Sequence, residues 1–386
     1  MNRFLDKKTA NYSYYLLMFF LPISLLLGNI FLSFLFLSIL LQKGRKTFNN
    51  GVIISLAVFF LFILINGLSS TNFGVEQNNY KKIIPLILIP FSIINLEKKT
   101  RLKGLLFLFF GVLIIQLNSV AGIIDYYYFS EGKKYALKNY SKINEIINYE
   151  RPYLGYFSVV NIIISYYLFK EKNKKILAII ATIFSLFLIL IISARLSIIT
   201  ILFLIIITVF IESNKRNRLI ALSGLIVLSL LFYFNNSSLK HRFSQINKDA
   251  RVVIWKGALN SFTNTENKIT GSGSQVNTRK ELLDHYKMND SFESVDEKNR
   301  FITKNYNTHN QYLNEILRGG IIGLVIFVFP QLLNLYSNFR KENSILGLLF
   351  LLSILCFCLV ENILDRQIGV YLYAFILSFS YANKNN

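Results

Sequence analysis

Residues Asn305–Gly323 read N-Y-N-T-H-N-Q-Y-L-N-E-I-L-R-G-G-I-I-G and join the longest polar segment of the chain to a long apolar run. Tyr312, Leu313, Ile316 and Leu317 follow His309 at the intervals that define one face of a helix. The stretch therefore predicts an apolar helix with a titratable imidazole at its mouth. From spacing alone, a surface or helix-capping histidine explains the pattern equally well.

The composition indicates an all-α polytopic membrane protein. The 386-residue chain is 53% hydrophobic and only 16% charged, whereas soluble domains carry about 25% charged residues. The charges gather in short islands between long apolar runs, which is typical of membrane-spanning helices. These runs predict a bundle of about twelve transmembrane helices, since each helix needs roughly 20 apolar residues.

The distribution of charge argues against a nucleic-acid-binding protein, and the few histidines and cysteines argue against a metalloprotein. A net charge of +21 could suit a nucleic-acid partner, but most lysines and arginines fall in short loops between apolar runs, so we expect no nucleic acid. The 3 histidines and 2 cysteines are too few for a metal site. We expect neither a metal nor another cofactor.

The apolar runs divide the chain into three parts: spans within residues 1–234, a large external loop at 235–311, and further spans within 312–386. Short basic loops alternate with loops poor in Lys and Arg, so the positive-inside rule puts both termini in the cytoplasm. We expect an external loop at Ser69–Asn79 and a short interfacial helix around Ile143–Ile147. The predicted spans are Tyr12–Leu27, Asn29–Leu41, Gly51–Leu68, Ile83–Asn95, Gly104–Ile124, Tyr153–Phe169, two within Ile176–Ile211, Leu219–Phe234, Tyr312–Leu335, Ile345–Val360 and Ile368–Tyr381.

Ser193–Ser197, S-A-R-L-S, interrupts the apolar run Ile176–Ile211. As one helix this run would be roughly 54 Å long, whereas the hydrocarbon core is about 30 Å thick. We therefore expect two spans joined by a tight external turn. Arg195 should lie at the outer interface or face a wet cavity, because a charge inside the bilayer is costly. A snorkelling arginine at a helix end is the alternative.

The external loop contains one clear helical pattern, Ala250–Phe262, with Arg251 at its start and Trp255, the only tryptophan, as an expected interfacial anchor. Gly271–Ser274 reads as a flexible linker, because a lone G-x-G is weak evidence for a phosphate site. Arg279–Arg300 alternates in charge and predicts solvated surface.

Arg195, Arg251 and His309 are all predicted to face the external side. Together they suit an anionic, lipid-linked substrate. Arginine binds phosphate oxygens through two hydrogen bonds and keeps its charge. Histidine can accept a proton from a hydroxyl near neutral pH.

Several motifs resemble the O-antigen ligase/Wzy polymerase superfamily. They are S-A-R-L-S, then R-V-V-I-W-K-G-A-L (Arg251–Leu259), G-S-G, and H-N-Q-Y-L-N-E-I-L-R-G-G-I-I-G-L (His309–Leu324). The match covers roughly the C-terminal half. Weaker matches are K-K-I-I-P-L (Lys81–Leu86) and R-P-Y-L-G-Y (Arg151–Tyr156).

The resemblance implies a metal-independent C-type glycosyltransferase fold in the bacterial inner membrane. Such an enzyme takes a glycan from undecaprenyl diphosphate and transfers it to an acceptor hydroxyl on the periplasmic side. It implies that Arg195 and Arg251 hold the diphosphate, that His309 is the general base or positions the acceptor, and that Asn310 orients His309 or the sugar. The lesser candidates that it implies are Arg151, Lys82, Glu361 and Asp365.

Three functions remain open. An O-antigen ligase would use lipid A core or another glycan as acceptor, and a Wzy-type polymerase would extend the glycan. A lipid-glycan transporter is less favoured, because transporters usually show internal repeats and charges at mid-membrane. In each case we expect the partners to be the undecaprenyl-diphosphate-linked glycan and membrane lipids.

Overall fold

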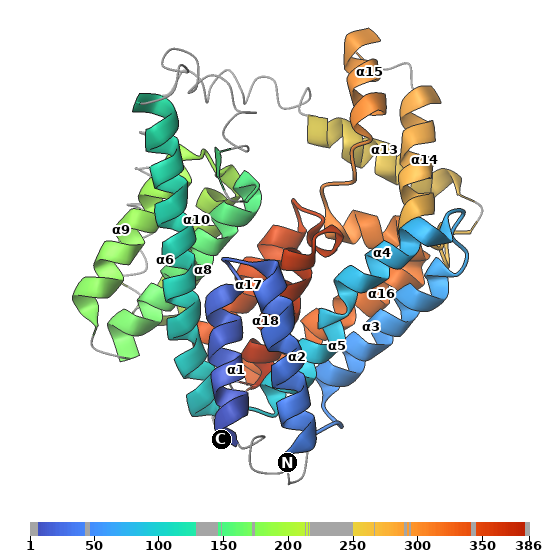
Figure 1. The fold of residues 1–386 in the computed structure, drawn as a ribbon. Helices are drawn as coiled ribbons and strands as arrows, with labels where there is room; N and C mark the ends of the chain where they lie inside the picture. The colour runs from blue at the N-terminus through green and yellow to red at the C-terminus, as the bar shows by residue number, and fades with distance from the viewer. Residues whose placement is uncertain are drawn as a thin grey trace.

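The structure, a computed structural model, describes residues 7–42, 47–128, 146–147, 149–171, 174–212, 214, 216, 250–265, 267–288, 292, 295–340 and 345–382. Within these residues every regular element is a helix, as the composition predicted, and no strand occurs (Figure 1). The predicted interfacial helix around Ile143–Ile147 lies largely, and the predicted span Leu219–Phe234 entirely, outside the described residues.

The first half of the bundle comprises α1 (Lys7–Phe20), α2 (Leu25–Leu41), α3 (Gly51–Gly67), α4 (Phe73–Ile83), α5 (Pro85–Ile94), α6 (Lys98–Tyr128), α8 (Arg151–Glu171), α9 (Lys175–Ile191) and α10 (Arg195–Glu212). The second half comprises α13 (Ala250–Asn264), α14 (Gln275–Met288), α15 (Val295–Lys304), α16 (Gln311–Arg340), α17 (Ile345–Cys358), the 3-10 turn η2 (Ile363–Asp365) and α18 (Gln367–Ala382).

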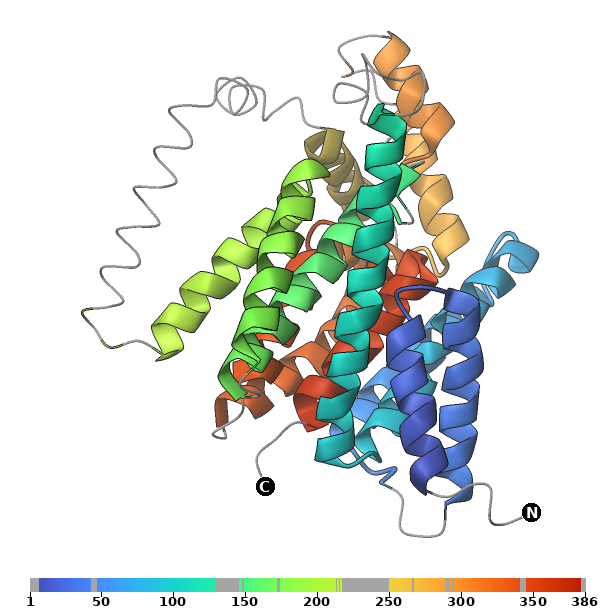
Figure 2. The ribbon, with the colours of Figure 1, turned by 60° about the vertical axis from the view of Figure 1, so that its left-hand side comes forward.

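Helix α18 forms the centre of the bundle. Its residues from Ile368 to Ser380 are all buried, and it contacts α3, α5, α16 and α17. A helix that is apolar all round can be buried all round, and the sequence of α18 meets this condition. Helices α1, α2 and α6 pack on one side of the bundle, and α8, α9 and α10 form a second group beside them (Figures 1 and 2).

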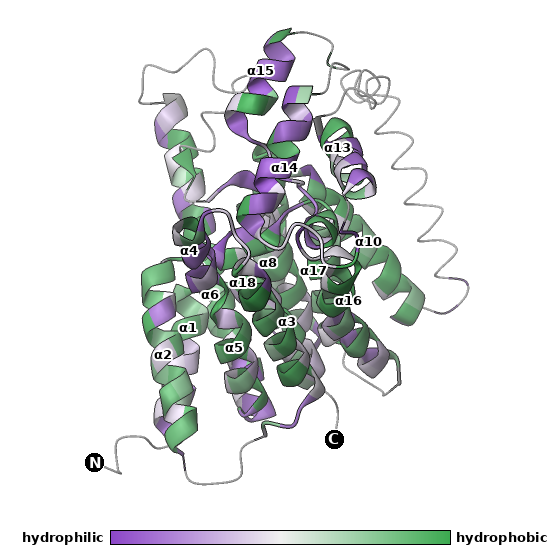
Figure 3. Cartoon of the chain, turned by 90° about the vertical axis from the view of Figure 1, so that its right-hand side faces the viewer, coloured by the Kyte–Doolittle hydropathy of each residue, from purple (hydrophilic) through white to green (hydrophobic). Residues whose placement is uncertain are grey.

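The outward-facing surface of the bundle is apolar. On α9, for example, Ile176, Ile180, Ile183 and Leu190 are all more than half exposed. Contiguous exposed apolar surface of this kind is typical of a lipid-facing belt. Four described helices, α6, α8, α10 and α16, are long and apolar enough to cross a membrane. Hydrophilic residues concentrate instead in α4 and α13–α15 at one end (Figure 3).

The prediction that Ser69–Asn79 is a loop is wrong from Phe73 onward, because α4 begins there. The Asn72 side chain accepts a hydrogen bond from the Val75 N–H at 3.2 Å and caps the helix. Glu76 is buried and accepts from the backbone N–H of Val276 at 3.3 Å. The next helix, α5, has only 10 residues, or about 15 Å. It is therefore too short to cross a bilayer by itself.

Helix α16 is broken at Gly320, which adopts φ 61° and ψ −156°. Gly271–Gly273 lies against this break: Ser272 N donates to Leu317 O at 2.9 Å and Gly273 N donates to Arg318 O at 2.8 Å. In turn, Ile321 N donates to Lys268 O at 3.0 Å. The loop thus satisfies backbone groups that the break would leave unpaired. The prediction of a free linker at Gly271–Ser274 is wrong.

The prediction that Arg279–Arg300 is solvated surface is wrong in part, because some of its side chains are buried. It contributes to α14 and α15, which pack with α13 around a small separate core. The members of this core are Ile254, Ala258, Leu282, Tyr286, Phe301 and Leu317. The apolar residues of this segment recur only once per helical turn. Among alternating charges, this spacing did not indicate a buried helix face.

Candidate active site

A cavity of about 410 Å³ opens at the end of the bundle that carries α13–α15. It brings together five segments that are far apart in sequence: the start of α8, the α9–α10 turn, the start of α13, the loop before α16 and the residues after α17. Arg195, Arg251 and His309 all line it. Its full lining is Glu150, Arg151, Pro152, Ser193, Ala194, Arg195, Leu196, Ser197, Arg251, His309 and Glu361.

A tight turn presents Arg195, as the sequence predicted. Ser193 has φ 52°, and its N–H donates to Leu190 O at 3.1 Å, while Ala194 N donates to Ile189 O at 3.0 Å. This pair of bonds is the Schellman pattern that ends α9. Arg195 is then the first residue of α10 and is exposed.

Close packing against α8 fixes the position of this turn. A Cβ atom added to Gly155 would lie 2.6 Å from Ala194 Cβ and 2.5 Å from Ser197 Oγ. Only glycine allows this approach, because real Cβ contacts do not come so close. In the R-P-Y-L-G-Y match, Gly155 therefore allows the close packing of α8 against the Arg195 turn. The sequence did not predict this role, because a single glycine inside a helical pattern does not indicate close packing.

Helix α13 carries Arg251 to the cavity, and Trp255 joins this helix to the His309 loop. The indole Nε1 of Trp255 donates to the carbonyl oxygen of Thr308 at 3.0 Å. A buried indole N–H needs such a partner. Trp255 therefore connects α13 with the His309 loop, two segments that line the cavity. The sequence predicted only an interfacial anchor at this position.

The loop that carries His309 is held by asparagine side chains. Asn362 Oδ1 accepts from Asn310 N at 2.7 Å and from Thr308 Oγ1 at 2.9 Å. The backbone N–H of His309 donates to Asn307 Oδ1 at 3.2 Å. His309 itself has φ 45°, a left-handed conformation that is uncommon outside glycine. Such conformations cost about 1–3 kcal/mol and cluster at functional sites.

Glu361 lies between the two predicted functional groups. Its Oε2 is 3.6 Å from His309 Nδ1, and its Oε1 is 3.6 Å from Arg251 Nη2. These distances are too long for hydrogen bonds but close enough for ion pairing. His309 Nδ1 is buried without a hydrogen-bond partner, although 30% of the side chain is exposed.

The cavity has a positive charge balance. Three positively charged residues, Arg151, Arg195 and Arg251, and two negatively charged ones, Glu150 and Glu361, line it. Glu150 also forms an ion pair with Arg366, outside the lining. Glu150 was not among the predicted site residues. Burial raises the pKa of Tyr149, the residue before Glu150, to about 12.

Asn310 and two of the lesser candidates, Asp365 and Lys82, do not line this cavity. Asn310 caps α16, since its Oδ1 accepts from Leu313 N at 3.0 Å. Asp365 accepts from Arg279 Nη2 at 2.8 Å, from Asn307 Nδ2 at 3.0 Å and from Gln275 Nε2 at 3.0 Å. It therefore links the His309 loop to α14. Lys82 lines a different cavity.

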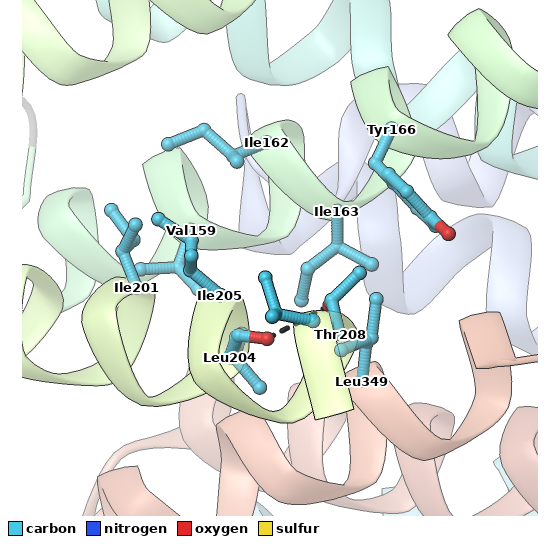
Figure 4. A pocket seen from close by; sticks show the side chains of 10 residues that line it. Val159, Ile162, Ile163, Tyr166, Ile201, Leu204, Ile205, Thr208 and Leu349 are labelled. Atoms are coloured by element: carbon cyan, nitrogen blue, oxygen red, sulfur yellow. Dashed lines mark hydrogen bonds between the residues drawn. The ribbon is translucent and has the colours of Figure 1, made fainter. Parts of the chain in front are cut away.

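Two apolar cavities lie between the helices that lead away from the Arg195 turn. One, of about 180 Å³, is lined mainly by α8 and α10 and includes Val159, Ile163 and Leu204 (Figure 4). The other, of about 380 Å³, lies among α8, α9 and α10. Both share Ile162, Tyr166, Ile201 and Ile205. Together they form an apolar surface on the same helices that present Arg151 and Arg195.

Comparison of the sequence with known proteins and protein families found a match to a family model. No curated protein matches the chain. A model of the Wzy_C family, described as O-antigen ligase, matches residues 180–328. This range contains Arg195, Arg251 and His309, whereas Arg151 and Glu361 lie outside it. Residues 180–328 of this chain are therefore similar to the O-antigen ligase (Wzy_C) family.

Proposed function

We propose that the protein is an O-antigen ligase that transfers a glycan from undecaprenyl diphosphate to a hydroxyl of the lipid A core. The observation that carries this proposal is the convergence of Arg195, Arg251 and His309 on one cavity. All three residues also lie within the matched O-antigen ligase range. The expected partners are the lipid-linked glycan, the acceptor and membrane lipids.

The cavity suits the diphosphate of the donor. Guanidinium groups form paired hydrogen bonds with phosphate oxygens, and both Arg195 and Arg251 line the cavity. Arg151 adds a third positive charge. The apolar cavities between α8, α9 and α10 lie on the lipid side of the same helices. They offer a surface for the polyprenyl chain, whose burial is favourable by about 0.8 kcal/mol per CH₂ group.

The reaction balances without another reactant. The acceptor oxygen forms a bond to the anomeric carbon, and the bond from that carbon to the phosphate oxygen breaks. The electron pair of the broken bond stays on the diphosphate, where Arg195 and Arg251 stabilise it. The acceptor proton moves to His309 Nε2. Glu361, beside Nδ1, stabilises the resulting imidazolium and holds the ring in position.

The helix directions support a periplasmic position for the cavity. Each helix of the bundle that ends away from the cavity has lysine or arginine at or near that end, including Lys7, Lys98, Lys170, Lys175 and Arg340. By the positive-inside rule this end is cytoplasmic. The chain leaves α10 at the basic end and begins α13 at the cavity end (Figure 2). The predicted span Leu219–Phe234 lies between them. We therefore retain both termini in the cytoplasm of the inner membrane as part of this proposal.

A Wzy-type polymerase is the alternative, since both activities use the same donor. A deletion strain separates them. Loss of a ligase leaves full-length chains on undecaprenyl diphosphate and none on the lipid A core. Loss of a polymerase leaves lipopolysaccharide with a single repeat.

The direct test is a transfer assay with purified protein, a lipid-linked oligosaccharide and an acceptor. We expect transfer by the wild type and a loss of about 10²-fold or more in His309→Ala. His285→Ala is the matched control, because His285 lies on α14 outside the cavity. Thermal unfolding of each variant shows whether it is folded. Equal transfer by a folded His309→Ala variant would remove His309 from the mechanism.

A further inference from the structure

A second polar cavity, of about 380 Å³, lies at the same end of the bundle as the candidate active site. Helices α2, α4, α5 and α18 form its walls. Its lining residues are Asn29, Leu32, Ser33, Lys81, Lys82, Ile84, Pro85, Leu88, Gln367 and Tyr371. None of them lines the first cavity, so the two cavities are separate.

The second cavity carries two positive charges and no negative one. Lys81 and Lys82 line it, and no Asp or Glu does. Lys82 Nζ donates to Asn79 Oδ1 at 3.2 Å. Within the part of the chain that the structure describes, neither lysine forms an ion pair. Two unneutralised ammonium groups in one cavity repel each other, so an anion between them relieves this repulsion.

One helix N-terminus and an amide add to the preference for an anion. Helix α18 begins at Gln367, which lines the cavity. The N-terminal end of a helix dipole attracts negative charge. Asn29 Oδ1 accepts from Gln367 Nε2 at 2.9 Å and from Tyr371 OH at 2.7 Å. Since its oxygen accepts both bonds, the Nδ2 group of Asn29 remains as a donor.

The surroundings indicate a ligand that comes from the membrane. Ile84, on the cavity wall, is 44% exposed, and Ile30, next to Asn29 on α2, is 40% exposed. Both belong to the apolar outer surface of the bundle. The cavity thus joins a basic, hydrogen-bonding interior to a lipid-facing rim, which matches a molecule with an anionic head and an acyl chain.

The two cavities flank one short segment. Glu361 lines the first cavity and Gln367 lines the second, and η2 lies between them. Arg366, next to Gln367, is paired with Glu150 of the first cavity. The short connection between α17 and α18 therefore contributes a residue to each cavity.

We propose that the second cavity binds a phosphate group on the headgroup of the lipid that accepts the glycan. The assignment of this lipid as the acceptor rests on the proposed function, whereas the binding of a lipid phosphate does not. Lys81 and Lys82 hold the phosphate, with Asn29 as an additional donor, and the hydroxyl to be glycosylated extends past η2 toward His309.

The experiment measures lipid binding to the full chain in nanodiscs of neutral lipid. The probes are lipid A, dephosphorylated lipid A, phosphatidylglycerol and inorganic phosphate. We expect lipid A to bind at least about tenfold more weakly to Lys81→Gln/Lys82→Gln than to the wild type. Lys280→Gln, which removes an exposed lysine on α14 outside both cavities, should bind it as the wild type does. Dephosphorylated lipid A should bind weakly to all of them.

Equal lipid A binding by the wild type and a folded double-lysine variant overturns the proposal. Saturation of the cavity by inorganic phosphate at low concentration overturns its assignment to a lipid. Equal affinity for phosphatidylglycerol and lipid A overturns its assignment to the acceptor. If lipid A binding depends on the lysines but no glycan is transferred in the separate assay, the proposed function fails while the phosphate site stands.

Discussion

Trp255 Nε1 lies 3.0 Å from the carbonyl oxygen of Thr308, which directly precedes His309. This hydrogen bond connects the helix that carries Arg251 with the loop that carries the imidazole. Helix α13 also shares a small core with Leu317 of α16. The bond adds to this packing in fixing the distance between Arg251, the proposed phosphate-binding group, and the proposed base.

Trp255→Phe removes this hydrogen bond but keeps an aromatic ring in the small core of α13–α15. We expect about 1 kcal/mol of lost stability, the usual contribution of one hydrogen bond. We also expect a fall in kcat of about tenfold or more, because small displacements of positioned groups are costly. Thermal unfolding and the transfer assay measure the two effects. Unchanged kcat would show that the bond does not position His309.

Gly155→Ala tests the packing that presents Arg195. The added Cβ would meet Ala194 Cβ at 2.6 Å and Ser197 Oγ at 2.5 Å, so the turn must move. We expect donor affinity to fall about tenfold, as expected when a charged hydrogen bond is lost. Gly74→Ala is the control, because its nearest atom would be 3.6 Å away. If both variants bind donor equally well, the turn does not set the position of Arg195.

Glu361→Gln removes the carboxylate that lies 3.6 Å from both His309 and Arg251. Because the charge of Glu361 stabilises an imidazolium that forms only during reaction, we expect kcat to fall about 10- to 100-fold. The KM for the donor should change much less. Glu361→Asp should restore part of the activity, while Asp296→Asn, on exposed α15, should have no effect. A rise in KM alone would instead make Glu361 a binding residue.

Activity in the presence of EDTA tests the predicted independence from metals. Arginine side chains and an activated leaving group can replace a cation at the diphosphate. Among the described residues, no group of three His, Cys, Asp or Glu side chains could hold a metal ion. We expect wild-type transfer to be retained in excess EDTA. Loss of transfer that Mg²⁺ restores would contradict this prediction.

The sequence predicted most of the helices, because apolar length and basic flanks determine them. Ile176–Ile211 had to fold back at Ser193–Ser197, since one helix of that length cannot fit the bilayer. The fold of the large loop was harder to predict. Arg279–Arg300 looked solvated, and only tertiary packing reveals the small core of Leu282, Tyr286 and Phe301. Likewise, the local sequence around Gly271–Gly273 does not show whether this G-S-G segment is flexible or packs against a broken helix.

The site was partly predictable for the same reasons. Arg195 interrupts an apolar run, and Arg251 and His309 each open a helical pattern, so each has a local signal. Glu361 was found only through family resemblance, and Glu150 was not found. Their importance comes from distances to residues far along the chain, which no local pattern contains. Asn310 was assigned to the site but caps α16, because a helix N-terminus favours asparagine whatever lies nearby.

The central claim is that the arginines of the first cavity bind the donor diphosphate. The most direct test is the dissociation constant of undecaprenyl diphosphate for the wild type, Arg195→Gln, Arg251→Gln and the double variant. Lys256→Gln, an exposed charge on α13, is the control. We predict a loss of about tenfold for each arginine and about 100-fold for both, with no change in the control. A folded double variant that binds the donor as tightly as the wild type would contradict the account.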